Sequence, residues 1–310
     1  MCYSAQVHSS YKKYVRMFGA HINIHEFARL YLDGLEGRAD VRTAKGMDAM
    51  FAEPQTDDER EVRSLVERRN AAFAEGIEQE IFQQRKRKAD AERKLETKVT
   101  KAATEDVRIA GNKTQAGLRW IEDLKRTELK DRDHRIFPGW YAPVMIAEEG
   151  EYVVVPMRYR CRLPGWTEAM EKEKDGTYNA RRNRLGTVWR KLFGYRHGVM
   201  VIDTFYEHVK REGRQTILRF NPNPGQPLLA ACLWNRTTAP GEPELLSFAA
   251  ITDDPPPEVA AAGHDRCIIP IKPEHVDAWL NPDPSNLEAL YAILDDRVRP
   301  YYEHEIDKAA

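Results

Sequence analysis

The second residue of the chain could carry a reactive group. Met1 is followed by Cys2, and removal of Met1 would leave a thiol and a free α-amine on one residue. The α-amine titrates near about 7.7–8.0 and a thiol near about 8.5, so both are partly nucleophilic at neutral pH. Such an aminothiol can attack an aldehyde with nitrogen and close a ring with sulfur, or attack an acyl carbon as an N-terminal nucleophile. Position alone favours a cysteine that is simply the second residue.

Three polar residues farther along the chain could assist such a nucleophile. Glu207 follows an apolar run at residues 199–202, and desolvation at the end of a buried strand raises a carboxyl pKa and suits it to general acid–base work. His264 precedes the apolar segment 267–271 and could transfer protons near neutral pH. Asn179 could orient a reacting group with its amide. An exposed carboxylate, a capping histidine and a turn asparagine are the ordinary alternatives.

Alternating arginines indicate a second kind of site. Arg158, Arg160 and Arg162 alternate with apolar residues, which on an extended strand places three guanidiniums on one face. Together with Arg181, which could hold a phosphate through bidentate hydrogen bonds, they predict a phosphate track. Trp166 could provide a stacking surface for a base. A solvated edge strand with an aromatic residue in the core explains the pattern equally well.

Composition limits the kind of protein that carries these residues. The chain has 310 residues, 42% of them hydrophobic, and a net charge of -1, which predicts a globular protein whose nucleic-acid partner would need a local basic patch. Its four cysteines show no C-x-x-C spacing and suit a reducing compartment. We find no signal-peptide pattern and no apolar run of about 20 residues, so a cytoplasmic protein is expected.

The elements that must position these residues fall into two parts. Residues 11–35 have helical periodicity, and residues 56–132 are rich in charged residues and contain no proline. The second segment predicts two or three helices, with Gly111-Asn112 as a candidate turn, inserted into a single domain of residues 1–310. Its basic stretch could contact DNA or a partner, although a solvated helical hairpin is the preferred interpretation.

The remainder of the chain predicts an α+β fold. Short β-like runs separated by turn signals occupy residues 151–157, 198–205, 216–220, 228–234, 245–252 and 267–271. They are too closely spaced for repeated βαβ units, so we expect a mostly antiparallel, barrel-like sheet with flanking helices. Two short helices are expected near the end of the chain, at residues 275–280 and 287–294.

The order of several short motifs carries more information than any one of them. After Met1-Cys2 come residues 137–144, Leu163-Pro164-Gly165-Trp166, Asn179-Ala180-Arg181, Phe205-Tyr206-Glu207, residues 231–234, His264-Asp265-Arg266 and Ala278-Trp279-Leu280. This succession resembles the SOS response-associated peptidase (SRAP) family, whose members shield abasic sites in single-stranded DNA. The resemblance covers roughly the first 35 residues and residues 137–280, and it leaves out the helical insertion.

The resemblance implies a role for each matched residue. Cys2 would be the N-terminal nucleophile, and Asn179 would position it or the sugar. Glu207 would act as general acid and base in Schiff-base formation, His264 would assist proton transfer, and Arg181 would bind backbone phosphate. The chain departs from the family where Tyr3-Ser4 replaces the usual Gly-Arg after Met-Cys, which removes one phosphate contact.

We therefore expect a protein that binds single-stranded DNA and crosslinks to an abasic site through a thiazolidine at Cys2. Autocatalytic removal of Met1 would account for the peptidase in the family name. No cofactor or metal is required, and a monomer with abasic single-stranded DNA as its partner is expected. The alternatives are an N-terminal cysteine amidohydrolase or peptidase acting on a small substrate, and a non-enzymatic DNA-binding module.

Overall fold

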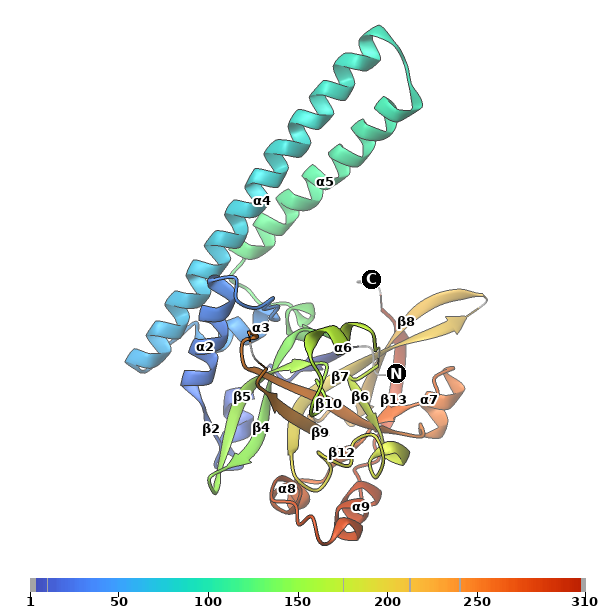
Figure 1. Ribbon diagram of the computed structural model, residues 1–310. Helices are drawn as coiled ribbons and strands as arrows, with labels where there is room; N and C mark the ends of the chain where they lie inside the picture. The colour runs from blue at the N-terminus through green and yellow to red at the C-terminus, as the bar shows by residue number, and fades with distance from the viewer. Residues whose placement is uncertain (1–3, 10, 175, 212, 240, 308–310) are drawn as a thin grey trace.

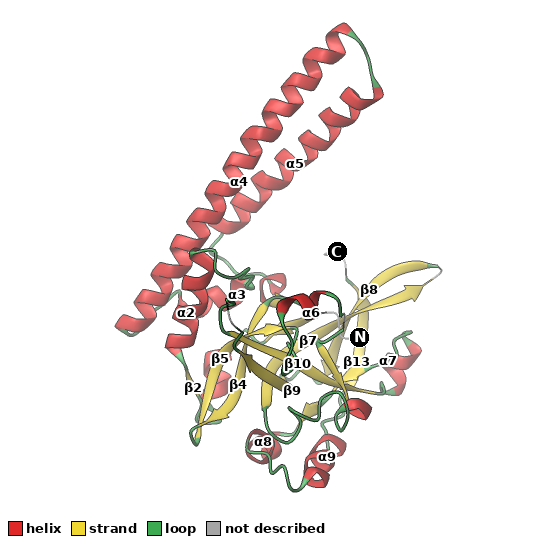
Figure 2. Ribbon diagram, viewed as in Figure 1, coloured by secondary structure: helices red, strands yellow, loops and turns green. Residues whose placement is uncertain are grey.

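A computed structural model describes residues 4–9, 11–174, 176–211, 213–239 and 241–307. Within them the strands form one 13-stranded sheet, and helices lie around it (Figures 1 and 2). This confirms the predicted α+β class. Among the helices of the described chain, none has the length and apolar character that a bilayer crossing requires.

Five long strands close into a ring. Going round it, β9 pairs with β10, β10 with β5, β5 with β4, β4 with β7, and β7 again with β9. All these pairings are antiparallel except β10 with β5, so the predicted mostly antiparallel arrangement is confirmed. The strands are β4 (Tyr141–Glu148), β5 (Glu151–Tyr159), β7 (His197–Arg211), β9 (Leu228–Thr237) and β10 (Leu245–Asp253).

Further strands pair with the strands of the ring and extend the sheet. The long strand β7 also pairs with β1 (Ser4–Val7) and β8 (Arg214–Asn223). The strand β6 (Asn179–Arg181) runs parallel to the end of β10. The remaining short strands are β2 (His21–Ile22), β3 (Arg135–Ile136), β11 (Cys267–Ile268), β12 (Pro270–Ile271) and β13 (Tyr301–Ile306).

The ring strands are apolar on both faces, because the sheet curves around one part of the core and helices cover the other. Each of β9 and β10 begins with eight consecutive buried residues, as expected for strands covered on both sides. The side chains of Phe248 and Trp279 are completely buried. The smaller helices around the sheet are α1 (Tyr11–Arg16), α2 (Ile24–Leu35), α3 (Lys45–Asp48), α6 (Glu168–Lys172), α7 (Pro257–Ala261), α8 (Val276–Leu280) and α9 (Leu287–Asp295). Short 3-10 helices connect elements at Ala49–Phe51, Asp131–His134, Arg182–Arg184 and Pro273–His275.

Two long helices form an arm that projects away from the ring (Figure 1). They are α4 (Asp57–Thr97) and α5 (Lys101–Lys125), and the side chains of Thr56 and Thr100 cap their first turns. The chain reverses direction between these helices, at residues 98–100. The predicted turn at Gly111-Asn112 is therefore wrong: both residues lie inside α5, where a glycine is tolerated at a cost of about 1 kcal/mol relative to alanine.

The first turns of α4 belong to the main core. Val62, Leu65 and Val66 are buried and join the same apolar cluster as the ring strands. Arg69 forms an ion pair of 2.6 Å with Asp48, which also accepts a hydrogen bond of 2.8 Å from the hydroxyl of Tyr31. The base of the arm is thus locked to α2 and α3. The helical insertion at residues 56–132 within a single domain stays a prediction, and its first turns contribute to the main core.

Candidate active site

The centre of the candidate site is a buried carboxyl group on β7. Glu207 lies where β7 pairs with both β1 and β8, opposite Leu218 of β8 and next to Tyr206, which pairs with Ser4. The side chain of Glu207 is completely buried. Since an isolated charge is costly in such surroundings, a carboxyl group here needs a polar partner.

That partner is His264, on the segment between α7 and β11. The backbone reverses at Gly263, whose φ of +100° is accessible to glycine, and the imidazole then points back toward β7. Its Nε2 lies 3.2 Å from Oε2 of Glu207, while its Nδ1 lies 2.9 Å from the carbonyl oxygen of Arg266. If Nδ1 carries a proton and donates it to that carbonyl, a hydrogen bond between Nε2 and Oε2 of Glu207 requires one further proton, shared by the imidazole and the carboxyl group.

Burial lowers the pKa of His264 from its usual value, which favours the neutral ring. A neutral imidazole facing a carboxyl group can accept or return the single proton that the pair holds. A group that can transfer a proton in this way is what general acid–base catalysis requires. The structure therefore brings together two of the residues predicted from sequence, although they are 57 positions apart.

Asn179 lies on β6 at the same end of the sheet. Thr252 of β10 pairs with Arg181 on one edge and with Ile268 of β11 on the other, so the segments that carry Asn179 and His264 flank one strand end. The Asn179 side chain is buried, and its Oδ1 accepts a hydrogen bond of 3.4 Å from the hydroxyl of Tyr159. With Oδ1 as the acceptor of this hydrogen bond, the amide NH2 group is the donor end of the side chain.

Arg181 follows on the same strand and is half exposed. Its guanidinium forms an ion pair of 3.0 Å with Asp254, a side chain that is 81% exposed. Exposed ion pairs contribute only about 0–1 kcal/mol, so a phosphate could replace Asp254 at little cost. The surface position of Arg181 suits a contact with a DNA backbone.

Comparison with protein families adds an independent observation. The family model described as SOS response associated peptidase (SRAP) matches residues 81–308. The chain belongs to the SRAP family. Membership supports a role in the SOS response to DNA damage and an interaction with DNA, in agreement with the resemblance noted in the sequence.

Solved structures show weaker similarity to this SRAP protein. A protein from Bordetella bronchiseptica is 19% identical, with a TM-score of 0.48, over 59% of this chain and 90% of its own. A protein from Bacteroides thetaiotaomicron is 12% identical, with a TM-score of 0.45, over 57% and 78% of the two chains. A phage-related protein from Bordetella bronchiseptica is 17% identical, with a TM-score of 0.44, over 60% and 86%. No curated protein matches the sequence.

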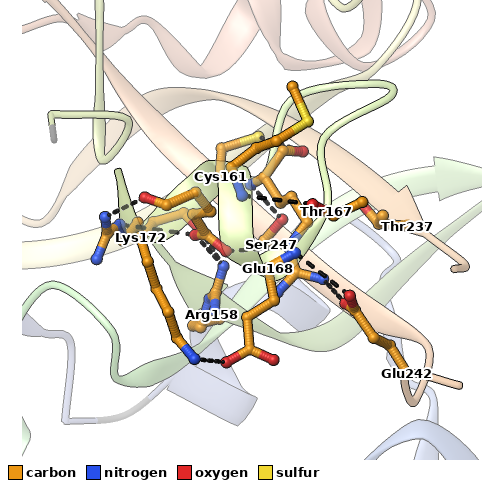
Figure 3. A network of polar contacts seen from close by, with 12 residues as sticks. Arg158, Cys161, Thr167, Glu168, Lys172, Thr237, Glu242 and Ser247 are labelled. Carbon is orange, nitrogen blue, oxygen red and sulfur yellow. Dashed lines mark hydrogen bonds and ion pairs between the residues drawn. The ribbon is translucent and has the colours of Figure 1, made fainter. Parts of the chain in front are cut away.

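The alternating arginines of the SRAP chain share one carboxylate partner. Glu171, a buried residue of α6, forms ion pairs with Arg158, Arg160 and Arg162, and Glu242 forms a second one with Arg162. Figure 3 gives a close view of these polar contacts, in which Arg158 and Glu242 are labelled. Burial would raise the pKa of Glu171, but hydrogen bonds from the guanidiniums outweigh it and lower the pKa.

This network corrects one part of the sequence prediction. The strand β5 ends at Tyr159, so of the three arginines only Arg158 lies within it, and all three converge on Glu171 instead of forming an open row. The side chain of Arg162 is only 6% exposed, and its guanidinium is held by two carboxylates, so it lacks a surface on which to bind phosphate. DNA binding by Arg158 and Arg160 stays a prediction. So does base stacking on half-buried Trp166, whose ring lies 4.7 Å from Nζ of Lys174.

Cys2 lies outside the described residues. The described chain begins at Ser4, whose hydroxyl accepts a hydrogen bond of 2.9 Å from Nε of Arg135. Arg135 also pairs with Asp307 and lies 3.6 Å from the centroid of the Tyr206 ring. These contacts fix the start of β1 beside Glu207. The sequence analysis missed Arg135 and Asp307 because their contacts are distant along the chain. Arg135 is 131 positions from Ser4, and Asp307 is 172 positions from Arg135.

Proposed function

We propose that this SRAP protein captures abasic sites in single-stranded DNA by covalent reaction with Cys2. The α-amine attacks the C1′ aldehyde of the ring-opened sugar, and an imine forms with loss of one water. The thiol then adds to the imine carbon and closes a thiazolidine. Every atom comes from the protein and the DNA, and the only small molecule released is water.

The buried pair of Glu207 and His264 is the observation that carries this proposal. Imine formation needs an acid that protonates the departing hydroxyl and a base that removes a proton from the nitrogen. One shared proton between a carboxyl group and an imidazole supplies both roles in turn. The donor NH2 group of Asn179 could hold the aldehyde oxygen or the cysteine in position.

Chain connectivity supports the assignment of Cys2. Only two peptide units separate Cys2 from Ser4, so their Cα atoms are at most about 7.6 Å apart, at 3.8 Å per unit. Ser4 pairs with Tyr206, the neighbour of Glu207. An N-terminal nucleophile is therefore tied by its own chain to the strand that carries the acid–base group.

The other three thiols are poor competitors. Cys161, Cys232 and Cys267 are free cysteines and buried. Burial raises the pKa of Cys161 to about 12 and raises the pKa of the other two thiols further. Because the thiolate is the nucleophile, these three side chains stay unreactive at neutral pH.

Intact mass after reaction with an abasic oligonucleotide tests the proposal. The expected product is protein without Met1, joined to the DNA with loss of one water, and the joining point maps to Cys2. An uncleaved N-terminal tag leaves the thiol but places the amine in a peptide bond, so it should abolish the stable adduct. Cys2→Ser should give only an imine that borohydride traps. A tagged protein that crosslinks as fast as the native one would contradict the aminothiol mechanism.

The acid–base pair is tested by variants that preserve its shape. Glu207→Gln and His264→Gln should slow crosslinking by about 10²-fold, the lower end of the range for a general acid–base group. Affinity for undamaged single-stranded DNA should stay unchanged. The alternative is an amidohydrolase. It predicts turnover of a small amide in the absence of DNA, and a rate of crosslinking that stays unchanged in Glu207→Gln and His264→Gln.

A further inference from the structure

Charge is distributed unevenly along the helical arm. The distal part, residues 85–113, contains ten Lys and Arg residues against five Asp and Glu residues. The proximal parts, residues 57–84 and 114–125, contain six basic against ten acidic residues. A chain with a net charge of -1 thus carries a net charge of about +5 at the end of its arm, which is the electrostatic footprint of a polyanion-binding surface.

Ion pairs within the arm neutralise only part of this positive charge. Four of the five distal carboxylates pair with neighbouring cations: Asp90 with Arg93, Glu92 with Lys88, Glu105 with Arg108, and Asp106 with Arg87. Within the described chain, no ion pair engages five further cations of the tip, all of them exposed: Arg85, Lys86, Lys94, Lys98 and Lys101.

The packing of the arm holds this cluster in the solvent. A narrow line of small and apolar side chains joins the two helices, including Ile81, Ala91, Ala103 and Ala110. A Cβ atom on Gly117 would lie 2.7 Å from Ile81, so this glycine allows α4 and α5 to approach closely. From Arg69, which is tied to Asp48, to Thr97 the helix rises about 42 Å at 1.5 Å per residue.

We infer that the tip of the arm is a second DNA-binding surface, which contacts the phosphate backbone outside the abasic site. The inference rests on the proposed function only in taking DNA as the partner. Duplex DNA carries one negative charge per about 1.7 Å and single strands carry one per nucleotide, which matches a cluster of flexible, exposed lysines and arginines. Neither sequence-specific nor apolar recognition is implied, because the five side chains act as point charges.

Paired variants on the same arm test this inference. The tip variant is Lys86→Gln, Lys94→Gln and Lys98→Gln. The control variant is Arg68→Gln, Arg119→Gln and Lys125→Gln, which removes three exposed cations from the proximal part of the arm. Each protein is titrated with undamaged DNA, either 8 or 40 nucleotides long, single-stranded or duplex, at several salt concentrations. Circular dichroism verifies that both variants keep their helices.

The tip variant should bind both 40-nucleotide DNAs about tenfold more weakly at low salt. The dependence of log K on log salt should become shallower by about 2 for single strands and about 3 for duplex, following three lost phosphate contacts. Binding of the 8-base-pair duplex, which at about 3.4 Å per base pair spans about 27 Å and is too short to reach both the domain and the tip, should not change. The larger loss identifies whether the tip prefers duplex or single-stranded DNA.

Two outcomes would overturn the inference. One is equal affinity and equal salt dependence of the tip and control variants on 40-nucleotide DNA, which would leave a protein partner as the use of the arm. The other is a loss of affinity in the tip variant that appears only when an RNA duplex of 40 base pairs is titrated in place of the DNA. Crosslinking of the 8-nucleotide abasic DNA is measured alongside, so that failure of the Cys2 chemistry in all proteins is recognised separately from failure of the arm.

Discussion

In the ring, strands pair with segments far away in the sequence, whereas in the arm α4 packs against α5, the next helix along the chain. Ser4 pairs with Tyr206, and Arg135 contacts Asp307. The two arm helices are separated by three residues, and their contact is a thin line of small side chains. The ring is therefore cooperative and intolerant of change, while most of the arm depends on local helix formation.

This difference separates the two functions we assign to them. An acid–base pair needs positions fixed to within a fraction of an ångström, which a densely packed ring supplies. Binding of a phosphate backbone by point charges needs reach and exposure, and a helical hairpin supplies both with little burial. Residues 57–69 are the exception within the arm, because they belong to the core of the ring.

The largest effect on folding is expected from removing residues 57–69 together with the rest of the arm. Excision of residues 57–125 should give an unfolded or aggregated protein, because loss of Val62, Leu65 and Val66 leaves a cavity in the main core. Excision of residues 82–116 only, with a short Gly-Ser turn in their place, should give a folded protein that still crosslinks abasic DNA. Circular dichroism and size-exclusion chromatography distinguish the two results. A folded product from the longer excision would show that the arm is separable after all.

The same contrast is expected for single residues of α4. Leu65 is 6% exposed and Phe82 is 72% exposed. Leu65→Ala should lower the free energy of unfolding by about 2–5 kcal/mol, because it removes apolar contacts and leaves a cavity. Phe82→Ala should change it by less than about 0.5 kcal/mol. Urea unfolding measures both, and similar losses in the two variants would contradict the proposed division of the helix.

Acid is expected to act on the ring through His197. Burial lowers its pKa to about 3, and its Nε2 accepts a hydrogen bond of 2.8 Å from the backbone N–H of Gly194. Between pH 3 and about 6.5 the unfolded chain binds the proton and the folded chain does not. The free energy of unfolding should therefore fall as the pH drops below about 6.5, by up to about 1.4 kcal/mol per pH unit from this residue.

Substitution separates His197 from the other titrating groups. His197→Gln should make the decrease between pH 6.5 and pH 5 shallower, whereas His25→Gln, at an exposed position, should leave it unchanged. Urea titrations at several pH values provide the measurement. An unaltered slope in the His197 variant would show that other groups cause the loss of stability in acid.

The smallest effect is expected from an ion pair of the arm. Arg87 and Asp106 join α4 to α5 at 2.5 Å, and both side chains are about 40% exposed. A double-mutant cycle with Arg87→Ala and Asp106→Ala should give a coupling energy below about 1 kcal/mol, which decreases with added salt. A larger value would mean that the arm is held together by its charges rather than by its narrow apolar contact.

The sequence by itself determined the elements with strong local patterns. The six predicted β-runs all coincide with observed strands, since alternating or continuous apolar residues and turn signals act within a few positions. The two arm helices and the closing helices follow from the same local rules. The ordered motifs also indicated the family, because their residue types and order can be compared without knowing how far apart they lie in space.

Only the tertiary structure decided which of these residues meet. The strand β4 was not predicted, and the structure shows that it pairs along its whole length with β5, with Pro143 opposite Pro156. Alternation predicted that Arg158, Arg160 and Arg162 share a face of one strand, but β5 ends at Tyr159, and Glu171, in a separate helix, pairs with all three guanidiniums. The contact of Glu207 with His264 has the same origin, because it joins a strand to a distant loop through a sheet whose pairings no local pattern specifies.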